Sequence, residues 1–128
     1  MKNLNIAREK SSPEVSLNAD TGVHHISGES YPENTKNFYL PVIEWIEEFI
    51  PQLKDDQETV FNFEMIYFNS SSSKILMDIF YLLDDAVAEE GKKVVINWIY
   101  DERNDSAEEY GEEFAEDLEN VTFNLIIK

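Results

Sequence analysis

The sequence contains no cysteine, and this absence excludes several kinds of chemistry at once. Without thiols the chain has no disulfide framework, no thiolate metal site and no thiol nucleophile. Glycine is scarce as well. The four glycines are scattered and form no loop that could cradle a phosphate group. We therefore expect neither thiol redox chemistry nor a nucleotide-binding glycine loop.

The chain also has few basic residues. Ten lysines and arginines stand against 27 aspartates and glutamates, which gives a formal net charge of −17. A chain of this charge repels nucleic-acid backbones and anionic membrane surfaces, so we expect no nucleic-acid partner and no membrane partner. Basic protein surfaces are better partners, although an acidic balance also keeps a small protein dispersed in solution.

Long apolar runs are missing too. No segment is long enough to span a bilayer, and residues 1–8 lack the central apolar block of a signal peptide. We therefore expect a cytoplasmic protein. With 128 residues and 42% hydrophobic content, the chain is predicted to form one domain over residues 1–128, in which residues 1–12 are a flexible N-terminal segment.

Hydrophobic periodicity predicts the order of the secondary structure. Short strands at Glu14–Asn18 and Val23–Ser27 are predicted to form a β-hairpin around the turn at 19–22. The remaining elements are a helix at about 35–50, a strand at 59–67, a helix at about 73–90, a strand at 94–99, a helix at 107–118 and a strand at 121–127. Pro41 either kinks the first helix or marks the first turn of its main segment.

Strands that alternate with crossover helices imply a mainly parallel sheet. We therefore predict an α/β fold in which a β-hairpin precedes a mainly parallel or mixed sheet covered by helices. Functional groups in such sheets gather at the carboxyl ends of the strands. Two segments qualify here, Asn69–Ser73 and Asp101–Asp105, and they share one rim of the sheet if the strands before them are parallel neighbours.

A row of four serines, Ser70 to Ser73, stands where a predicted strand gives way to a predicted helix. A phosphate added at a helix start interacts favourably with the free backbone N–H groups and the partial positive charge there. Serine is equally favoured at such positions for structural reasons, as an N-cap or loop residue. The row therefore predicts either a phosphorylation switch or an ordinary helix start.

The acidic loop and the histidines are candidates for metal chemistry. Asp101, Glu102 and Asp105 have the carboxylates that bind a hard cation such as Mg²⁺, and this defines a less favoured alternative, a metal-dependent hydrolase that uses residues 101–105. His24 and His25 are adjacent in a predicted strand, so they point to opposite faces and do not form a joint metal site. We expect no catalytic residue, metal or cofactor.

Two further groups of side chains leave a choice open. The glutamates of the last predicted helix form either a solvated face or a docking surface for a basic partner. Tyr31 and Tyr39 belong either to the core or to a partner-binding surface, whereas Trp45 is expected in the core. A constitutive acidic protein-interaction module without any switch shares all these features except modification of the serine row.

Four passages of the chain combine aromatic, proline and serine residues in an unusual way: residues 26–34 (ISGESYPEN), residues 38–42 (FYLPV) with Trp45, residues 67–74 (YFNSSSSK) and residues 98–101 (WIYD). Taken together, these passages resemble the SiaC family of bacterial regulatory phosphoproteins. Their order and spacing match the family over nearly the whole chain. The resemblance also implies a fold similar to that of STAS-domain anti-sigma factor antagonists.

The resemblance implies a non-enzymatic regulator in a partner-switching circuit. Such a regulator is phosphorylated on a hydroxyl by a dedicated protein kinase and dephosphorylated by a PP2C-type phosphatase. In the founding system of the family, the unphosphorylated form binds and activates a diguanylate cyclase, which raises cyclic-di-GMP and promotes aggregation or biofilm growth. The expected output partner of this chain is therefore a diguanylate cyclase.

The position of the phosphoacceptor is also implied by the resemblance. It is the residue immediately after Phe68-Asn69, which is Ser70 here, whereas the family commonly has threonine. Ser71 and Ser72 are the rival acceptors, and Ser73 is expected to cap the helix. The residues expected to contact partners are Asn69, Ser70, Ser71, Tyr31, Tyr39 and Asp101.

Overall fold

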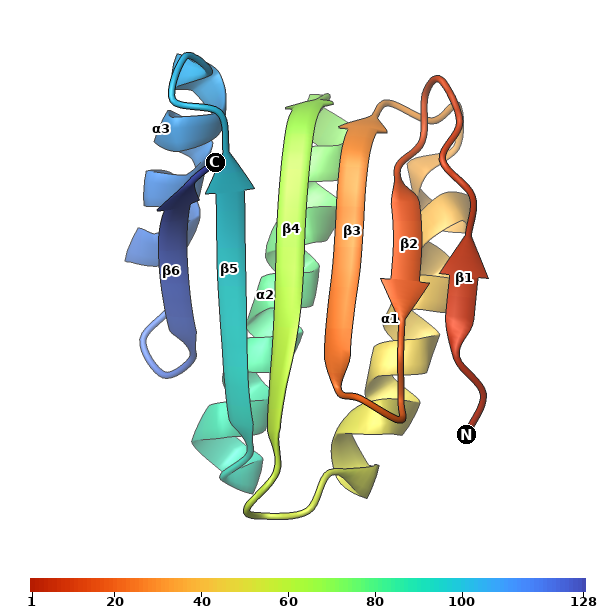
Figure 1. Cartoon of the computed structure of the whole chain (residues 1–128), viewed down its shortest axis with the longest axis vertical. Coiled ribbons are helices and arrows are strands. Elements are labelled where there is room, and N and C mark those ends of the chain that lie inside the picture. Colours follow the sequence, from red (N-terminus) through yellow and green to blue (C-terminus); the bar gives the residue numbers. More distant parts are fainter.

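The computed structural model describes residues 1–128 and shows one sheet of six strands covered by three α-helices (Figure 1). The strands are β1 (Leu4–Ile6), β2 (Glu14–Leu17), β3 (Val23–Ser30), β4 (Glu58–Phe68), β5 (Lys93–Tyr100) and β6 (Thr122–Ile127). The helices are α1 (Thr35–Phe49), α2 (Ser70–Glu90) and α3 (Asp105–Glu116), with a short 3₁₀ helix, η1 (Ile50–Gln52), after α1.

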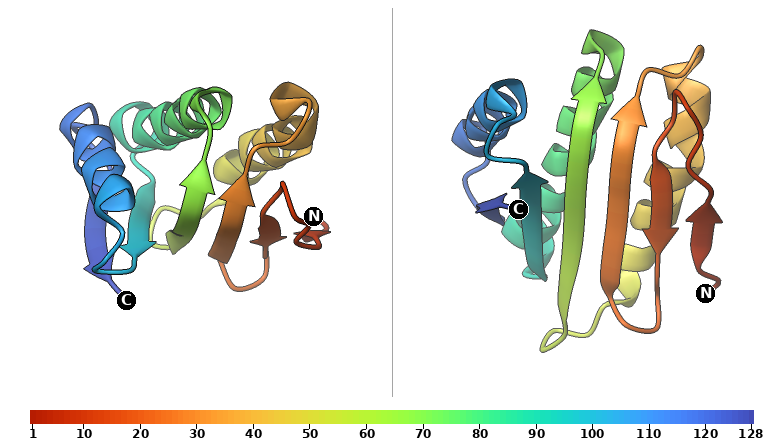
Figure 2. Two further views of the ribbon diagram at one scale, coloured as in Figure 1. Left: turned by 90° about the horizontal axis from the view of Figure 1, so that it is seen from above. Right: turned by 45° about the horizontal axis from the view of Figure 1, so that its top comes forward.

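The sheet is mixed, and its strands lie in the same order as in the chain. β1, β2 and β3 pair antiparallel, whereas β3, β4, β5 and β6 pair parallel. One α-helix connects the two strands of each parallel pair. Because such crossovers are right-handed and the parallel strands follow one another in chain order, all three helices lie on the same side of the sheet. Figure 2 shows all three helices on the same face of the sheet. The predicted α/β fold is confirmed.

The core lies between this face and the helices, where alternate strand residues point toward α1, α2 and α3. Phe61 and Phe63 of β4 and Trp98 of β5 are fully buried, as is Phe80 of α2, whose ring packs edge-on against Phe63 with centroids 5.0 Å apart. Trp45 lies in this core, as predicted. The period-2 alternation of burial along β4 and β5 explains why the sequence pattern identified both strands.

The N-terminal segment differs from its prediction. Residues 1–12 were expected to be flexible, but residues 4–6 form β1 and pair with β2. Two long-range hydrogen bonds hold this segment: Trp45 Nε1 donates to the carbonyl of Lys2 at 2.8 Å, and the N–H of Ala19 donates to Asn3 Oδ1 at 2.8 Å. A strand of three residues is too short to show a periodic pattern, so only these distant contacts reveal it.

The first helix resolves the choice that Pro41 left open. α1 runs without interruption from Thr35, and the side chain of Asn34 caps it by accepting the N–H of Asn37 at 3.1 Å. Pro41 therefore lies inside the helix rather than in its first turn. Its side chain is exposed, so it occupies the solvent side of α1.

β4 contains one extra residue near its end. The pairing with β3 shifts between Gly28 and Glu29, so that Gly28 lies opposite Met65 and Glu29 lies opposite Tyr67, which leaves Ile66 without a partner. A β-bulge of this kind interrupts the alternation of side chains and redirects them. Ile66 and Tyr67 are 53% and 52% exposed, so the prediction of a buried strand is wrong at these two residues.

Candidate functional site

The carboxyl ends of β4 and β5 meet at one rim of the sheet, because the two strands are parallel neighbours. The segments that follow them, at 69–73 and 101–105, therefore lie on the same side of the molecule, as the sequence predicted. A hydrogen bond connects the turn after β5 to the end of β4: the side-chain amide of Asn104 donates to the carbonyl of Ile66 at 3.0 Å.

The helix that follows β4 begins earlier than predicted. α2 starts at Ser70, and its N-cap is Asn69, whose side chain accepts the N–H of Ser72 at 2.9 Å while its carbonyl accepts the N–H of Ser73 at 2.9 Å. The prediction that Ser73 caps the helix is therefore wrong. Asparagine is as favourable an N-cap as serine, and the extended backbone at Asn69 suits that role.

The four serines have different environments. Ser70 and Ser71 are exposed, Ser73 is half-buried and Ser72 is fully buried. The Ser72 hydroxyl lies 2.7 Å from the Ser30 hydroxyl at the end of β3, where no kinase can reach it in the folded protein. Ser72 is therefore ruled out as a rival acceptor in this fold, and Ser70 and Ser71 are the two accessible candidates.

A buried chain of hydroxyl groups fixes this helix start. The Ser30 hydroxyl, which contacts Ser72, also lies 2.7 Å from the Tyr39 hydroxyl of α1. The carbonyl of Ser30 accepts the N–H of Asn69 at 3.0 Å. Burial raises the pKa of Tyr39 to about 12, so its phenol stays protonated. Because Tyr39 has no exposed surface, its predicted role as a partner contact is wrong.

Ser70 borders a shallow hollow without charged side chains. The hollow has a volume of about 410 Å³ and is lined, besides Ser70, by Ile66, Tyr67, Phe68, Asn69, Ser106, Ala107 and Tyr110. The half-buried Tyr31 contacts Tyr67 edge-on, with ring centroids 5.8 Å apart. Ile66, Tyr67 and Tyr110 are surface residues of this site that the sequence pattern did not predict. Four consecutive apolar residues at 65–68, where strict alternation would place polar residues, were the available signal.

Ser71 lies in a different environment from Ser70. It lines a hollow of about 480 Å³ between the starts of α1 and α2, together with Glu33, Asn34, Thr35, Lys36, Lys74, Ile75 and Asp78. Two lysines and two carboxylates therefore line the hollow at Ser71, whereas no charged side chain lines the hollow at Ser70. A phosphate on Ser71 has nearby cations within the same molecule, and a phosphate on Ser70 has none among the residues of its hollow.

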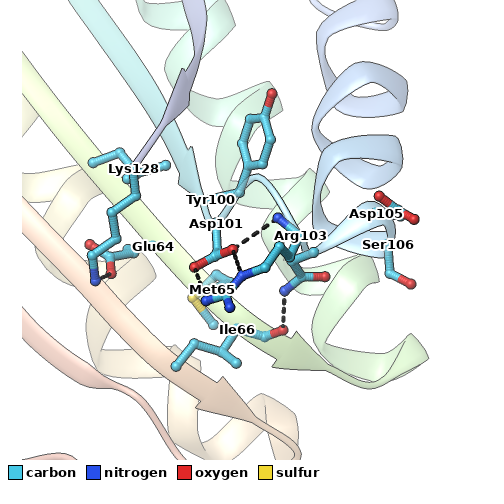
Figure 3. Close-up of a pocket in the computed structure, with 11 residues that line it drawn as sticks. Glu64, Met65, Ile66, Tyr100, Asp101, Arg103, Asp105, Ser106 and Lys128 are labelled. Carbon is cyan, nitrogen blue, oxygen red and sulfur yellow. Dashed lines mark hydrogen bonds and ion pairs between the residues drawn. The ribbon is translucent and has the colours of Figure 1, made fainter.

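The acidic loop forms the wall of a third hollow, of about 810 Å³ (Figure 3). Asp101 is held by Arg103, whose backbone N–H and Nε donate to Asp101 Oδ1 at 2.9 and 3.1 Å. These hydrogen bonds lower the pKa of the Asp101 carboxyl. A second ion pair, 2.6 Å long, joins Lys128 Nζ to Glu64 Oε2.

The arrangement of these carboxylates does not support the hydrolase alternative. No group of three or more histidine, aspartate or glutamate side chains in the structure is placed to hold a metal ion. His24 and His25 face opposite sides of the sheet, as predicted, with His24 buried and His25 exposed. Asp101 is exposed on the rim, and its role as a partner contact stays a prediction.

Comparison with known proteins agrees with the fold. The model of the SiaC family regulatory phosphoprotein matches residues 6–128. An uncharacterized protein of Pseudomonas aeruginosa strain UCBPP-PA14 is 37% identical over 118 residues, which cover 91% of this chain and 90% of that protein. No helix of the chain combines the length and the apolar character needed to cross a membrane.

Solved structures extend the comparison. Apo-SiaC from Pseudomonas aeruginosa is 33% identical, with a TM-score of 0.89 over 98% of this chain and 99% of that chain. The same identity, TM-score and coverage hold for the activator SiaC in its complex with the diguanylate cyclase SiaD from Pseudomonas aeruginosa. The chain therefore belongs to the SiaC family of regulatory phosphoproteins, and it is a regulator rather than an enzyme.

Proposed function

We propose that the protein is a cytoplasmic switch in a partner-switching pathway. Its unphosphorylated form binds an output protein, a diguanylate cyclase of the SiaD type, through the rim around Ser70. A protein kinase phosphorylates Ser70 and so prevents this binding, and a PP2C-type phosphatase restores it. The pathway thereby controls cyclic-di-GMP and biofilm growth or aggregation.

The observation that carries this proposal is the environment of Ser70. The residue is exposed at the N-terminus of α2, where a kinase has access, and it borders two side chains, Ile66 and Tyr67, that are half exposed although both are large and apolar. Exposed apolar and aromatic side chains of this kind supply much of the contact area in protein interfaces. The same surface is therefore suited to modification and to partner binding.

The charge of a phosphate explains the direction of the switch. Phosphorylation adds about −1.5 to −2 charges, and the chain already has a formal charge of −17. No basic side chain lines the hollow beside Ser70. An interface that covers Ile66 and Tyr67 would bury this phosphate in a hollow whose own side chains supply no cation, and burial of an unpaired charge is costly. We therefore expect phosphorylation to weaken binding.

Serine variants test the proposal. Ser70→Ala is expected to bind a SiaD-type cyclase from the same organism as the wild type does, and Ser70→Asp is expected to bind at least about tenfold more weakly, or ~1.4 kcal/mol. Ser71→Asp is the matched control, because it adds the same charge at a neighbouring exposed serine that lies outside the hollow beside Ser70. Calorimetry or surface plasmon resonance gives the affinities. Equal binding of folded Ser70→Ala and Ser70→Asp would contradict the proposed mechanism.

A further inference from the structure

The outer edge of β6 is uncovered. β6 is the last strand of the sheet and pairs only with β5. Natural edge strands usually carry charges, prolines or bulges that prevent further pairing, but residues 122–127 contain neither a proline nor a charged residue. Leu125, Ile126 and Ile127 are 39%, 39% and 56% exposed. The edge therefore lacks the usual protection against another strand.

The backbone of β6 has free hydrogen-bonding groups on this edge. The N–H of Lys128 donates to the carbonyl of Tyr100 in β5 at 2.8 Å. Successive residues of a parallel strand direct their backbone groups to opposite sides, so the residues that face β5 alternate with residues that face outward. The N–H and C=O groups of Phe123, Leu125 and Ile127 therefore point away from β5 and have no strand to pair with.

An acidic stripe accompanies this edge on the helix side of the sheet. Glu108, Glu112 and Glu116 follow one another at intervals of four residues along α3. The Tyr100 hydroxyl donates to Glu108 Oε2 at 3.2 Å, and Tyr100 lies opposite Ile127 in the sheet. Burial, this hydrogen bond and the charges of Glu108 and Glu112 raise the pKa of Tyr100. Glu108 therefore lies beside the Ile127 end of β6, and Glu112 and Glu116 continue the stripe along α3.

We propose that the β6 edge and the acidic stripe bind an extended segment of a partner protein in which lysine or arginine alternates with apolar residues. The segment adds a strand to the sheet through the free backbone groups of β6. Its basic side chains lie on the helix side, where their aliphatic stems pack on Leu125 and Ile127 and their charged ends reach Glu112 and Glu116. Its apolar side chains lie on the open face beside Ile126.

Charge favours this occupant over a second copy of the chain. Pairing of two β6 strands would bring together two acidic stripes and two molecules that each carry a formal charge of −17. A basic segment instead neutralises the stripe. The surface does not include Ser70 or the hollow beside it, so the inference does not depend on phosphorylation.

A short capped peptide of alternating lysine and valine tests this surface. In the full chain labelled with ¹⁵N, the peptide is expected to shift the amide signals of Phe123, Leu125 and Ile127 most strongly. Ile127→Pro removes an outward N–H and leaves the pairing with β5 intact, and it is expected to weaken binding about tenfold, or ~1.4 kcal/mol. A peptide with glutamate in place of lysine is expected not to bind.

Paired charge reversals separate specific binding from general attraction to an acidic protein. Glu112→Lys/Glu116→Lys is expected to weaken binding of the lysine–valine peptide by at least about tenfold. Glu44→Lys/Glu48→Lys on α1 changes the charge equally, at the same spacing and at exposed positions, and is expected to leave binding within about twofold. Equal loss in both double variants, shifts outside β6, or a concentration-dependent dimer that excludes the peptide would overturn the proposal.

Discussion

The side chain of Asn104, in the turn after β5, is hydrogen-bonded to Ile66 near the end of β4. Its amide donates to the carbonyl of Ile66 at 3.0 Å, and its carbonyl oxygen accepts the N–H of Ala107 at 3.1 Å and so caps α3. Ile66 is the extra residue in the bulge of β4. One asparagine therefore stabilises the start of α3 and fixes the carbonyl of the bulged residue next to the hollow at Ser70.

Removal of this side chain tests the double role. Asn104→Ala loses a helix cap and a hydrogen bond to Ile66, each worth about 1 kcal/mol, so we expect the free energy of unfolding to fall by ~2 kcal/mol. Asn34→Ala is the matched control, because Asn34 makes only the cap bond to Asn37. Urea unfolding measures both. Equal losses in the two variants would show that the bond to Ile66 contributes nothing.

The corrected helix cap gives a second prediction. Asn69→Ala removes the acceptor of the Ser72 N–H and is expected to cost about 1 kcal/mol of stability. Ser73→Ala removes a half-buried hydroxyl with no hydrogen bond in the structure and is expected to change stability by less than about 0.5 kcal/mol. Thermal unfolding distinguishes the two variants. A larger loss for Ser73→Ala than for Asn69→Ala would restore Ser73 as the cap.

The buried His24 makes stability depend on pH. Its Nδ1 accepts the N–H of Asn18 at 3.0 Å, so Nε2 carries the proton toward Thr59 Oγ1, 2.9 Å away. Burial, with a smaller effect from His25, lowers the pKa of His24 to about 4 from 6.5. The unfolded chain therefore binds a proton between pH 6.5 and pH 4, while the folded chain does not.

Stability should consequently fall as the pH drops through this range, by up to ~3 kcal/mol. His24→Gln is expected to remove most of that pH dependence, whereas the exposed His25→Gln is expected to retain it. Urea unfolding at a series of pH values measures the slope. Burial opposes ionisation of the Asp84 carboxyl, but hydrogen bonds from Val121 and Asn120 outweigh it and lower the pKa, so the contribution of Asp84 is lost as the pH falls through that lowered pKa. An unchanged slope in His24→Gln would assign the effect to other groups.

Close packing at Gly111 predicts the effect of one added methyl group. A Cβ at this position would lie 2.5 Å from Trp98 Cδ1 and 2.6 Å from Leu125 Cδ2, so in Gly111→Ala either α3 or these two side chains must shift. We expect a loss of about 1–3 kcal/mol and an altered fluorescence spectrum of Trp98. Gly91→Ala is the control, because a Cβ there meets nothing within 4 Å and only the positive φ of +66° opposes it. That variant should leave the spectrum of Trp98 unchanged.

Local patterns in the sequence identify most of the fold, because burial alternates along β4 and β5 and recurs at helical spacing along α1 and α2. β1 escapes such patterns, since it depends on pairing with β2 and on the contact between Trp45 and Lys2. The bulge at Ile66 depends on the register with Gly28 of a different strand. Local rules carry no information about such long-range pairings.

The candidate site likewise combines features that local sequence patterns predict with features that depend on long-range packing. The resemblance to the family points to Ser70 as the phosphoacceptor, and Ser70 is exposed in the structure. The spacing of the four serines alone does not show which of them are exposed. Burial of Ser72 and Tyr39 against Ser30 depends on how α1 and α2 pack together at the end of β3. Asparagine and serine are both favoured N-caps, so the sequence alone does not decide between Asn69 and Ser73. The extended backbone at Asn69 identifies it as the cap.

The most direct test of the central claim is to map phosphate on the protein isolated from its native host. Intact mass and fragment spectra, with and without phosphatase treatment, identify the modified residue. The proposed switch predicts a single phosphate on Ser70 that the phosphatase removes. No phosphate under several growth conditions and none added by the cognate kinase in vitro, or phosphate on Ser71 alone, would contradict it. The first of these results would instead identify a constitutive binding module.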